Sequence, residues 1–240
     1  AIFGEEVDPA FFIGLAIHAG IGSGISAEGN INMLQRLVVH RPARLGEALT
    51  VKGEIKSVTA VPRGQRVETD VWFEDLAGER VISCPRTSLR PQAQAQSKSG
   101  AGDKPQPVVG DVAALLLRDT YQLTPDRVKS YSVEGNSIHY EQEAAERAGF
   151  RAPLIGGGMG VHYLTAQMWQ DRRPSFFDVS IYFRRPIFWD EAVQVGVIED
   201  GGNWSGMGLL KLPLKAERVG TSSEVAKVGT ELSIADYRLA

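Results

Sequence analysis

The chain has 240 residues, of which 43% are hydrophobic and 23% are charged. This mixture is typical of a folded globular protein and excludes a fibrous or wholly disordered one. The 26 basic and 29 acidic residues give a net charge of −3, so nothing in the charge balance favours nucleic acid or an anionic membrane as a partner. The single cysteine, Cys84, excludes an internal disulfide and a zinc site built from cysteines. We expect a cytoplasmic protein.

The first candidate helix is unusually rich in glycine. The apolar stretch 10–22 is too short to span a bilayer, and acidic residues precede it where a signal peptide would carry basic ones. Gly14, Gly20 and Gly22 lie inside the helical pattern, and an interior glycine costs a helix about 1 kcal/mol relative to alanine. We therefore expect a shortened or interrupted helix that leaves an apolar groove. A loosely packed helix without a ligand is the alternative.

Long alternating segments predict β-strands in both parts of the chain. VETDVWFED and GMGLLKLPLKAE alternate, and turns that contain glycine or proline separate the segments. The expected strands cover 48–59, 65–75, 79–90, 178–186, 191–199, 206–216 and 224–238. Consecutive strands joined by hairpins indicate an antiparallel sheet, and a helix expected over 158–170 would bury its apolar face against it. The pattern predicts an α+β fold.

A change in composition divides the chain. The run from Pro91 to Pro107 consists of small and polar residues, which cannot supply a packed core. We place a linker at 93–107, between an N-terminal half, 1–92, and a C-terminal half, 108–240. Each half is large enough to form a small domain or half of a joint one.

The two halves also resemble each other. HRPARLGEALTV at 40–51 aligns without a gap with RRPIFWDEAVQV at 184–195, and the same offset of 144 places His18 on His162. A shared order of helix, extended segment, Arg-Pro turn and strands predicts two related units that pair side by side into one sheet, with chance similarity as the alternative. We expect the two histidines to pack their helices rather than to catalyse a reaction.

Residues that could take part in catalysis or ligand binding are concentrated between Thr124 and Met159. A helix is expected to start at Thr124-Pro125 and to break at Gly135. Glu134, Asn136 and His139 follow one another on an irregular turn, where a carboxylate and an imidazole can converge on one water as an acid–base pair. The alternative is a solvated Glu134 and a His139 on the apolar side of the next helix.

Three consecutive glycines precede the helix expected over 158–170. Gly156, Gly157 and Gly158 would let a ligand approach backbone N–H groups that are aligned with the helix dipole, and a thioester oxygen could be held there. The alternative is that the glycines only allow close packing of the helix on the sheet. Their spacing matches neither a dinucleotide-binding fingerprint nor a phosphate-binding loop.

The segment 132–159 resembles the signature of MaoC-like, (R)-specific enoyl-CoA hydratases, S-G-D-x-N-P-[IL]-H followed by G-[FY]-x-x-P-I-x-H-G-M. Glu134, Asn136 and His139 stand where that signature has its catalytic Asp, its Asn and its catalytic His, and Gly157 matches the glycine whose N–H is the oxyanion donor. The chain departs from the signature by four substitutions, Val133 for Gly, Glu134 for Asp, Ser137 for Pro and Gly156 for His, and by an extra glycine before Met159.

The resemblance implies a double hot-dog fold, in which two antiparallel sheets each wrap a central helix and pair within one chain, the first half being a degenerate repeat. It implies a hydratase or dehydratase that acts on an acyl-CoA thioester, with Glu134 and His139 as catalytic residues and Asn136 and the three glycines as substrate-binding residues. No metal or redox cofactor is then needed, and the groove in the first half would hold the acyl chain. A hot-dog thioesterase and a noncatalytic acyl-thioester-binding protein are the alternatives, and a homodimer stays open.

Overall fold

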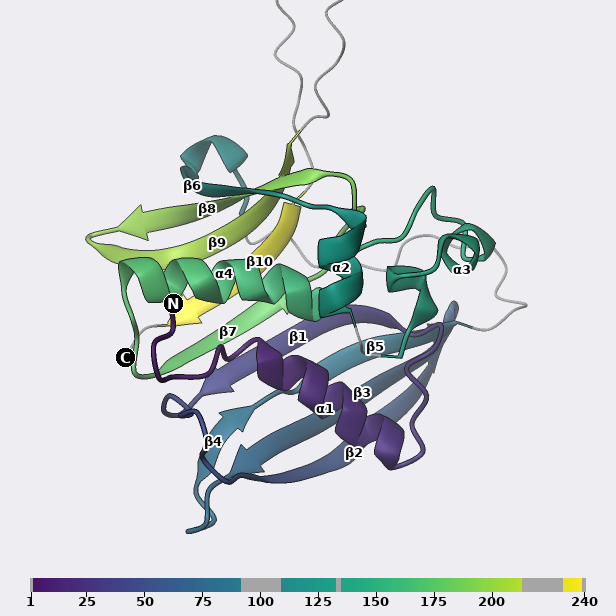
Figure 1. Ribbon diagram of the computed structural model, residues 1–240, viewed down its shortest axis with the longest axis horizontal. Helices are drawn as coiled ribbons and strands as arrows, with labels where there is room; N and C mark the ends of the chain where they lie inside the picture. Colours follow the sequence, from purple (N-terminus) through teal and green to yellow (C-terminus); the bar gives the residue numbers. More distant parts are fainter. Residues whose placement is uncertain (1, 92–108, 133–134, 213–230, 239–240) are drawn as a thin grey trace, which may run out of the picture.

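The structure is a computed structural model that describes residues 2–91, 109–132, 135–212 and 231–238 (Figure 1). The predicted linker and Glu134 lie outside the described residues. The first half contains α1 (Phe11–Gly22), β1 (Ile31–Val39), β2 (Thr50–Val61), β3 (Gly64–Glu74), β4 (Arg80–Ser83) and β5 (Arg86–Pro91). The second half contains η1 (Val112–Ala114), β6 (Leu116–Gln122), α2 (Pro125–Tyr131), η2 (Ser137–His139), α3 (Gln142–Arg147), α4 (Gly157–Asp171), β7 (Phe177–Tyr182), β8 (Ala192–Asp200), β9 (Asn203–Leu212) and β10 (Glu231–Arg238).

The strands form one antiparallel sheet that runs through both halves. Its order is β2-β3-β4-β1-β7-β10-β9-β8-β6, and β5 pairs with β1 and β3. The halves meet at β1 and β7, where Leu34 pairs with Tyr182 and Val39 pairs with Phe177. Val39 and Phe177, the last pair of residues along this junction, are fully buried. The predicted antiparallel pairing is confirmed, and the sheet passes from one half to the other without a break.

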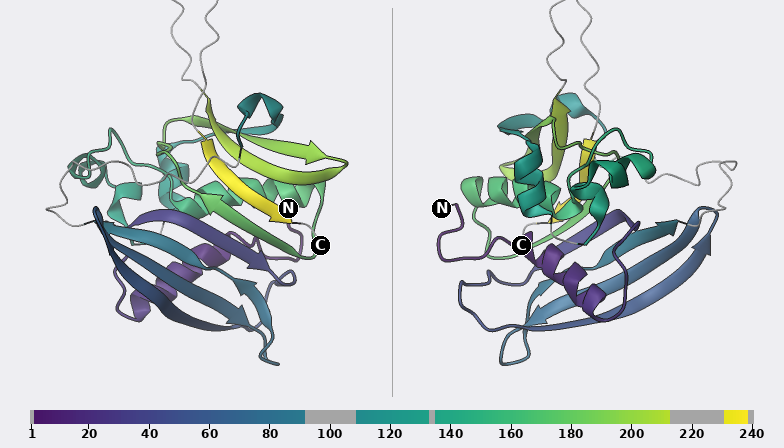
Figure 2. Two further views of the ribbon diagram at one scale, coloured as in Figure 1. Left: turned by 180° about the vertical axis from the view of Figure 1, so that it is seen from behind. Right: turned by 45° about the vertical axis from the view of Figure 1, so that its right-hand side comes forward.

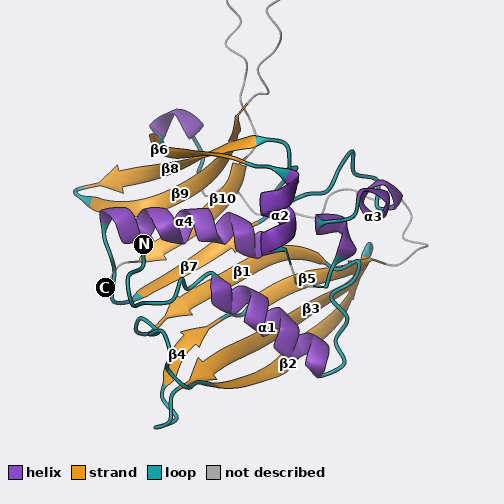
Figure 3. Cartoon of the chain, viewed as in Figure 1, coloured by secondary structure: helices purple, strands orange, loops and turns teal. Residues whose placement is uncertain are grey.

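Helices α1 and α4 lie on one face of this sheet (Figure 1), and on the opposite face, seen from behind, the η1 segment packs through Val112 against Leu210 (Figure 2). Helix α4 packs on β8 and β9, α1 packs on β2, and the two helices touch each other. Colouring by secondary structure separates this helical layer from the strands beneath it (Figure 3). Met159, Leu164 and Met168 of α4 are buried in the core that joins the two halves. No helix among the described residues is long and apolar enough to cross a membrane.

Helix α1 is continuous, so the prediction that Gly14 and Gly20 interrupt it is wrong. Its buried side chains include Phe12 and Ile13. Burying one such side chain stabilises a protein by about 1.5–3 kcal/mol, more than the roughly 1 kcal/mol that one glycine costs a helix. The helix ends at Gly22, after which Ser23 donates its backbone N–H to the carbonyl oxygens of the last turn.

The strand expected over 79–90 is divided in two. Strand β4 ends at Ser83 and β5 begins at Arg86, so Cys84 and Pro85 lie between them. Proline has no N–H to donate to a neighbouring strand, which explains the break. Pro85 still accepts a hydrogen bond through its carbonyl oxygen, from the backbone N–H of Arg36 at 2.8 Å.

The internal repeat is visible in the hydrogen bonds. The Glu47 carboxylate accepts a hydrogen bond of 3.0 Å from the backbone N–H of Arg44. At the same place in the second half, the Glu191 carboxylate accepts one of 2.8 Å from the backbone N–H of Phe188. The two segments that look alike in sequence therefore form the same turn, each closed by its own glutamate.

Candidate functional site

A cavity of about 520 Å³ lies where the two halves meet. Its walls come from the start of β1, from β5, from the segment that includes η2, from the start of α4 and from the segment after β7. Of the predicted site residues, the lining includes Asn136, His139, Gly156, Gly157 and Gly158. Five residues that the sequence pattern and the family resemblance singled out thus line one space.

The backbone holds His139 in a single orientation. It is the last residue of the 3-10 turn η2, and its Nδ1 lies 2.9 Å from the carbonyl oxygen of Leu154. A carbonyl oxygen only accepts hydrogen bonds, so Nδ1 carries the proton and the neutral ring keeps a lone pair on Nε2. No described residue bonds to Nε2. The imidazole therefore offers the cavity a proton acceptor, as a general base requires.

Two amide side chains in the cavity wall carry oxygens without a partner. Asn136 is buried, and its Nδ2 donates to the carbonyl oxygen of Asn30 at 3.4 Å. The Oδ1 atoms of Asn136 and of Asn32 are both buried and accept no hydrogen bond from the described residues. Buried polar atoms are nearly always satisfied, so a donor such as a water or a ligand hydroxyl is expected at each of these oxygens.

The first turn of α4 presents two free N–H groups. Gly156 precedes the helix without a side-chain cap, and its carbonyl oxygen accepts from the N–H groups of Met159 at 3.1 Å and Gly160 at 3.3 Å. The N–H groups of Gly157 and Gly158 have no acceptor among the described residues. With the partial positive charge of the helix N-terminus, they can stabilise an oxygen that acquires negative charge.

Gly157 is also needed for packing. A Cβ at this position would lie 2.8 Å from Cζ of Phe183, which would have to shift, and 3.1 Å from Nδ2 of Asn32, which is a tight contact. The structure therefore supports the alternative interpretation of this glycine, close packing, while its role in binding stays a prediction. Gly157 has no side chain, so Asn32 can lie against the start of α4. The same lack of a side chain leaves the backbone N–H of Gly157 accessible.

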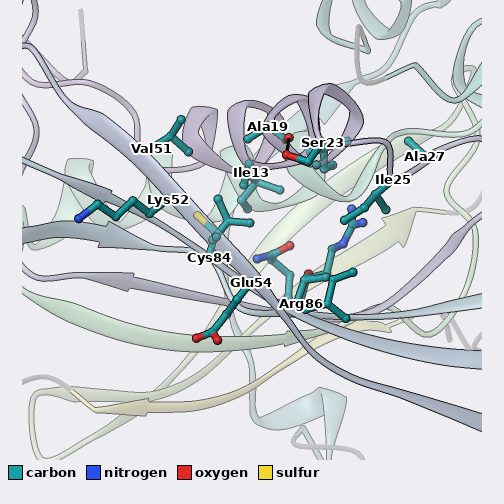
Figure 4. A pocket seen from close by; sticks show the side chains of 18 of the residues that line it. Ile13, Ala19, Ser23, Ile25, Ala27, Val51, Lys52, Glu54, Cys84 and Arg86 are labelled. Atoms are coloured by element: carbon teal, nitrogen blue, oxygen red, sulfur yellow. Dashed lines mark hydrogen bonds between the residues drawn. The ribbon is translucent and has the colours of Figure 1, made fainter.

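A second cavity, of about 360 Å³, adjoins the first one and lies between α1 and the sheet (Figure 4). We call it the α1 cavity. Ile17, Ala27 and Arg86 line both cavities. Most of the remaining α1-cavity wall is apolar and includes Ile13 and Val71. Sequence reasoning expected a groove here but missed Arg86, as it missed Asn32, because the first half carries no motif that points to either residue.

The two helix histidines lie apart from this site. His18 is exposed, so the expected packing role does not apply to it. His162 hydrogen-bonds through Nδ1 to the carboxylate of Asp8, and its ring lies 5.8 Å from that of Tyr131. It packs as expected, and it ties the N-terminal segment to α4. Neither histidine lines either of the two cavities. Among the described residues, no group of three or more metal-ligating side chains comes together.

Known structures share this architecture. HtdX from Mycobacterium tuberculosis is 18% identical, with a TM-score of 0.72 over 100% of this chain and 91% of that one. A MaoC-like dehydratase from Phytophthora capsici is 19% identical, with a TM-score of 0.60 over 88% of this chain and 72% of that one. A further Mycobacterium tuberculosis protein, described as having a double hotdog fold, is 12% identical, with a TM-score of 0.58 over 97% and 80% of the two chains.

A protein assigned as an oleoyl thioesterase, from Lactobacillus plantarum, is also similar: it is 10% identical, with a TM-score of 0.59 over 98% of this chain and 90% of that one. No protein-family model matches the sequence, and no curated protein matches it significantly. At these identities the likeness establishes the fold, so the resemblance to MaoC-like proteins is confirmed at that level. The chain has the hotdog α+β fold.

Proposed function

We propose that the protein is a hydratase or dehydratase that adds water to a 2-enoyl thioester, or removes it from the 3-hydroxyacyl thioester, with coenzyme A as the expected thiol. The observation that carries the proposal is the His139 ring, whose proton sits on Nδ1 and whose Nε2 is left to the cavity that the α4 N-terminus also faces. In this proposal each half is a hot-dog unit whose sheet wraps its own helix.

The reaction follows from the groups around the cavity. Glu134 and His139 orient a water and remove one of its protons, and the water oxygen bonds to C3 of the enoyl group. The electron pair of the C2–C3 double bond moves toward the thioester oxygen, where the N–H of Gly157 stabilises the enolate. A proton then returns to C2, so that one water is consumed for each thioester. Asn136 holds the water or the carboxylate in place.

The acyl chain runs into the α1 cavity in this proposal. That cavity adjoins the candidate site and has apolar walls, so it suits the tail of a substrate whose thioester lies at the start of α4. Small residues of α1, namely Ala16, Ala19 and Gly20, line part of this space. A hydrophobic pocket of this kind discriminates by chain length at about 1–3 kcal/mol for each methylene.

Thioester hydrolysis is the second candidate, because one of the similar structures is assigned as an oleoyl thioesterase. In that reaction the water would attack C1 instead of C3, and the same N–H of Gly157 would stabilise the tetrahedral oxyanion. The site is then the same and only the position of the water relative to the thioester differs.

One assay separates the candidates. Loss of the conjugated enoyl absorbance is followed across straight-chain and branched 2-enoyl-CoA substrates, and a thiol reagent reports free CoA in parallel. Absorbance loss without CoA release supports the hydratase proposal. CoA release at a matching rate supports the thioesterase. Binding of these thioesters without either signal would contradict both enzymatic functions and favour the acyl-thioester-binding protein.

A further inference from the structure

Arg86 stands at the boundary between the two cavities. It begins β5, and its backbone pairs with Gln35 on β1 and with Thr69 on β3, which fixes the place of its Cα in the sheet. The side chain lines both the cavity that holds His139 and the α1 cavity. In Figure 4 it extends from the sheet toward Ile25. An acyl chain that passes from one cavity to the other must therefore pass this guanidinium.

The guanidinium of Arg86 has no hydrogen-bond or ion-pair partner among the described residues. The other charged side chains of the α1 cavity are neutralised: Lys52 lies 2.6 Å from a carboxylate oxygen of Glu74, and Glu54 pairs with Lys56. Burial lowers the pKa of Arg86 from its usual value, because desolvation disfavours the charged form. Arg86 is partly exposed to solvent, so its guanidinium is an incompletely solvated cation without an acceptor from the described residues, and an anionic ligand in the cavity would supply one.

We propose that Arg86 binds a carboxylate carried by the acyl chain, so that the substrate is an acidic acyl thioester. This inference rests on the proposed function, since it names the substrate of the same site. A guanidinium donates two parallel N–H groups to a carboxylate, a geometry that an ammonium or an amide does not offer. The phosphates of coenzyme A are the other anions of such a substrate. They are less suited, because the wall that Arg86 shares leads to the apolar α1 cavity.

Binding of saturated thioesters tests the inference without any turnover. Calorimetry compares dicarboxylyl-CoA ligands, from succinyl to suberyl, with monocarboxylyl-CoA ligands of the same length, and uses CoA alone as a third arm. The wild-type protein should bind at least one acidic member about 10- to 100-fold more tightly than its neutral partner, the change expected for one charge-assisted hydrogen-bonded pair. Equal affinity at every length, or a preference for the neutral ligands, would overturn the proposal.

Variants assign the preference to one side chain. Arg86→Met keeps the length of the apolar stem and should abolish the preference while leaving the affinity for neutral ligands within about threefold. Arg86→Lys should keep part of it, since the charge stays and the two-pronged geometry is lost. The matched control is Arg90→Met, which removes an exposed cation from the same strand and should keep the full preference.

Two variant results would contradict the inference. A loss of affinity for CoA alone in Arg86→Met would mean that the side chain holds the phosphates, and an equal loss for acidic and neutral ligands would mean that it only shapes the cavity. If Arg86→Met does not fold, the wild-type comparison and Arg86→Lys still decide. The proposed function can fail independently: absence of enoyl turnover with a retained acidic preference would reject the hydratase and keep this binding site.

Discussion

The hydrogen bond between His139 and Leu154 allows the catalytic and structural parts of the histidine to be separated. Asparagine places an N–H close to the position of Nδ1, so His139→Asn keeps a donor for the Leu154 carbonyl oxygen but has no base. Glutamine reaches toward the position of Nε2, so His139→Gln leaves that carbonyl without its donor. We expect both variants to lose hydration activity and only the second to lose the structural contact.

The two effects differ in size. A hydrogen bond of this kind contributes about 0.5–1.5 kcal/mol to stability, so His139→Gln should be about 1 kcal/mol less stable than His139→Asn. A general acid–base group contributes a factor of about 10²–10⁴ in rate, or roughly 2.7–5.5 kcal/mol of activation free energy. Urea unfolding measures the first difference and enoyl absorbance the second. Turnover by His139→Asn at the wild-type rate on a verified substrate would refute the assignment of His139 as a base.

Further predictions concern the turns, the α1 cavity and the thiol. Arg41 lowers the pKa of Glu47 below its usual 4.5, so Glu47→Gln should cost about 1 kcal/mol or less at pH 7; the difference from wild type should begin to shrink as pH falls below 4.5 and should vanish below the lowered pKa of Glu47. Glu191 makes the same turn and is buried, but its partners Arg151 and Lys211 are partly exposed and Arg151 keeps Asp190, so Glu191→Gln should cost about 1–3 kcal/mol in urea unfolding, more than Glu47→Gln. Ala16→Phe should fill the α1 cavity and reduce turnover of long-chain thioesters at least about tenfold while sparing short ones. Leu15→Phe, on the exposed side of the helix, should not discriminate between chain lengths, and a uniform loss in both variants would contradict the acyl path. Burial raises the pKa of the Cys84 thiol, so alkylation at pH 8 should be slow in the native protein and fast in urea; rapid native labelling would show that the cavity wall opens.

Local features of the site could be predicted from the sequence. Asn136, His139 and the glycines before α4 lie on a short turn and on a helix start, two elements whose geometry depends on residues close in the chain. The hydrogen bond from His139 to Leu154, two residues before Gly156, joins these two elements beside one cavity. The acid–base pairing with Glu134 stays a prediction, since that residue lies outside the described part of the chain.

Contributions from the first half could not be predicted in the same way. Asn32 and Arg86 reach the site through the β1–β7 junction, and strand pairing across more than a hundred residues leaves no motif near either one. The prediction that glycines interrupt α1 was wrong for a related reason. Helix propensity is a local quantity, whereas Phe12 and Ile13 are buried by contacts with distant parts of the chain.

During synthesis, β1 cannot pair with β7 until most of the second half has been made. Val39 pairs with Phe177, 138 residues further along the chain. At about 5–20 residues per second a ribosome needs roughly 7–28 s to cover that distance, and until then β1 has one unpaired edge. A strand edge of this kind is a template for pairing with other chains, and Leu37 and Val39 beside it are apolar. The nascent first half would thus need a chaperone, or rapid completion of the second half, to avoid association with its own copies.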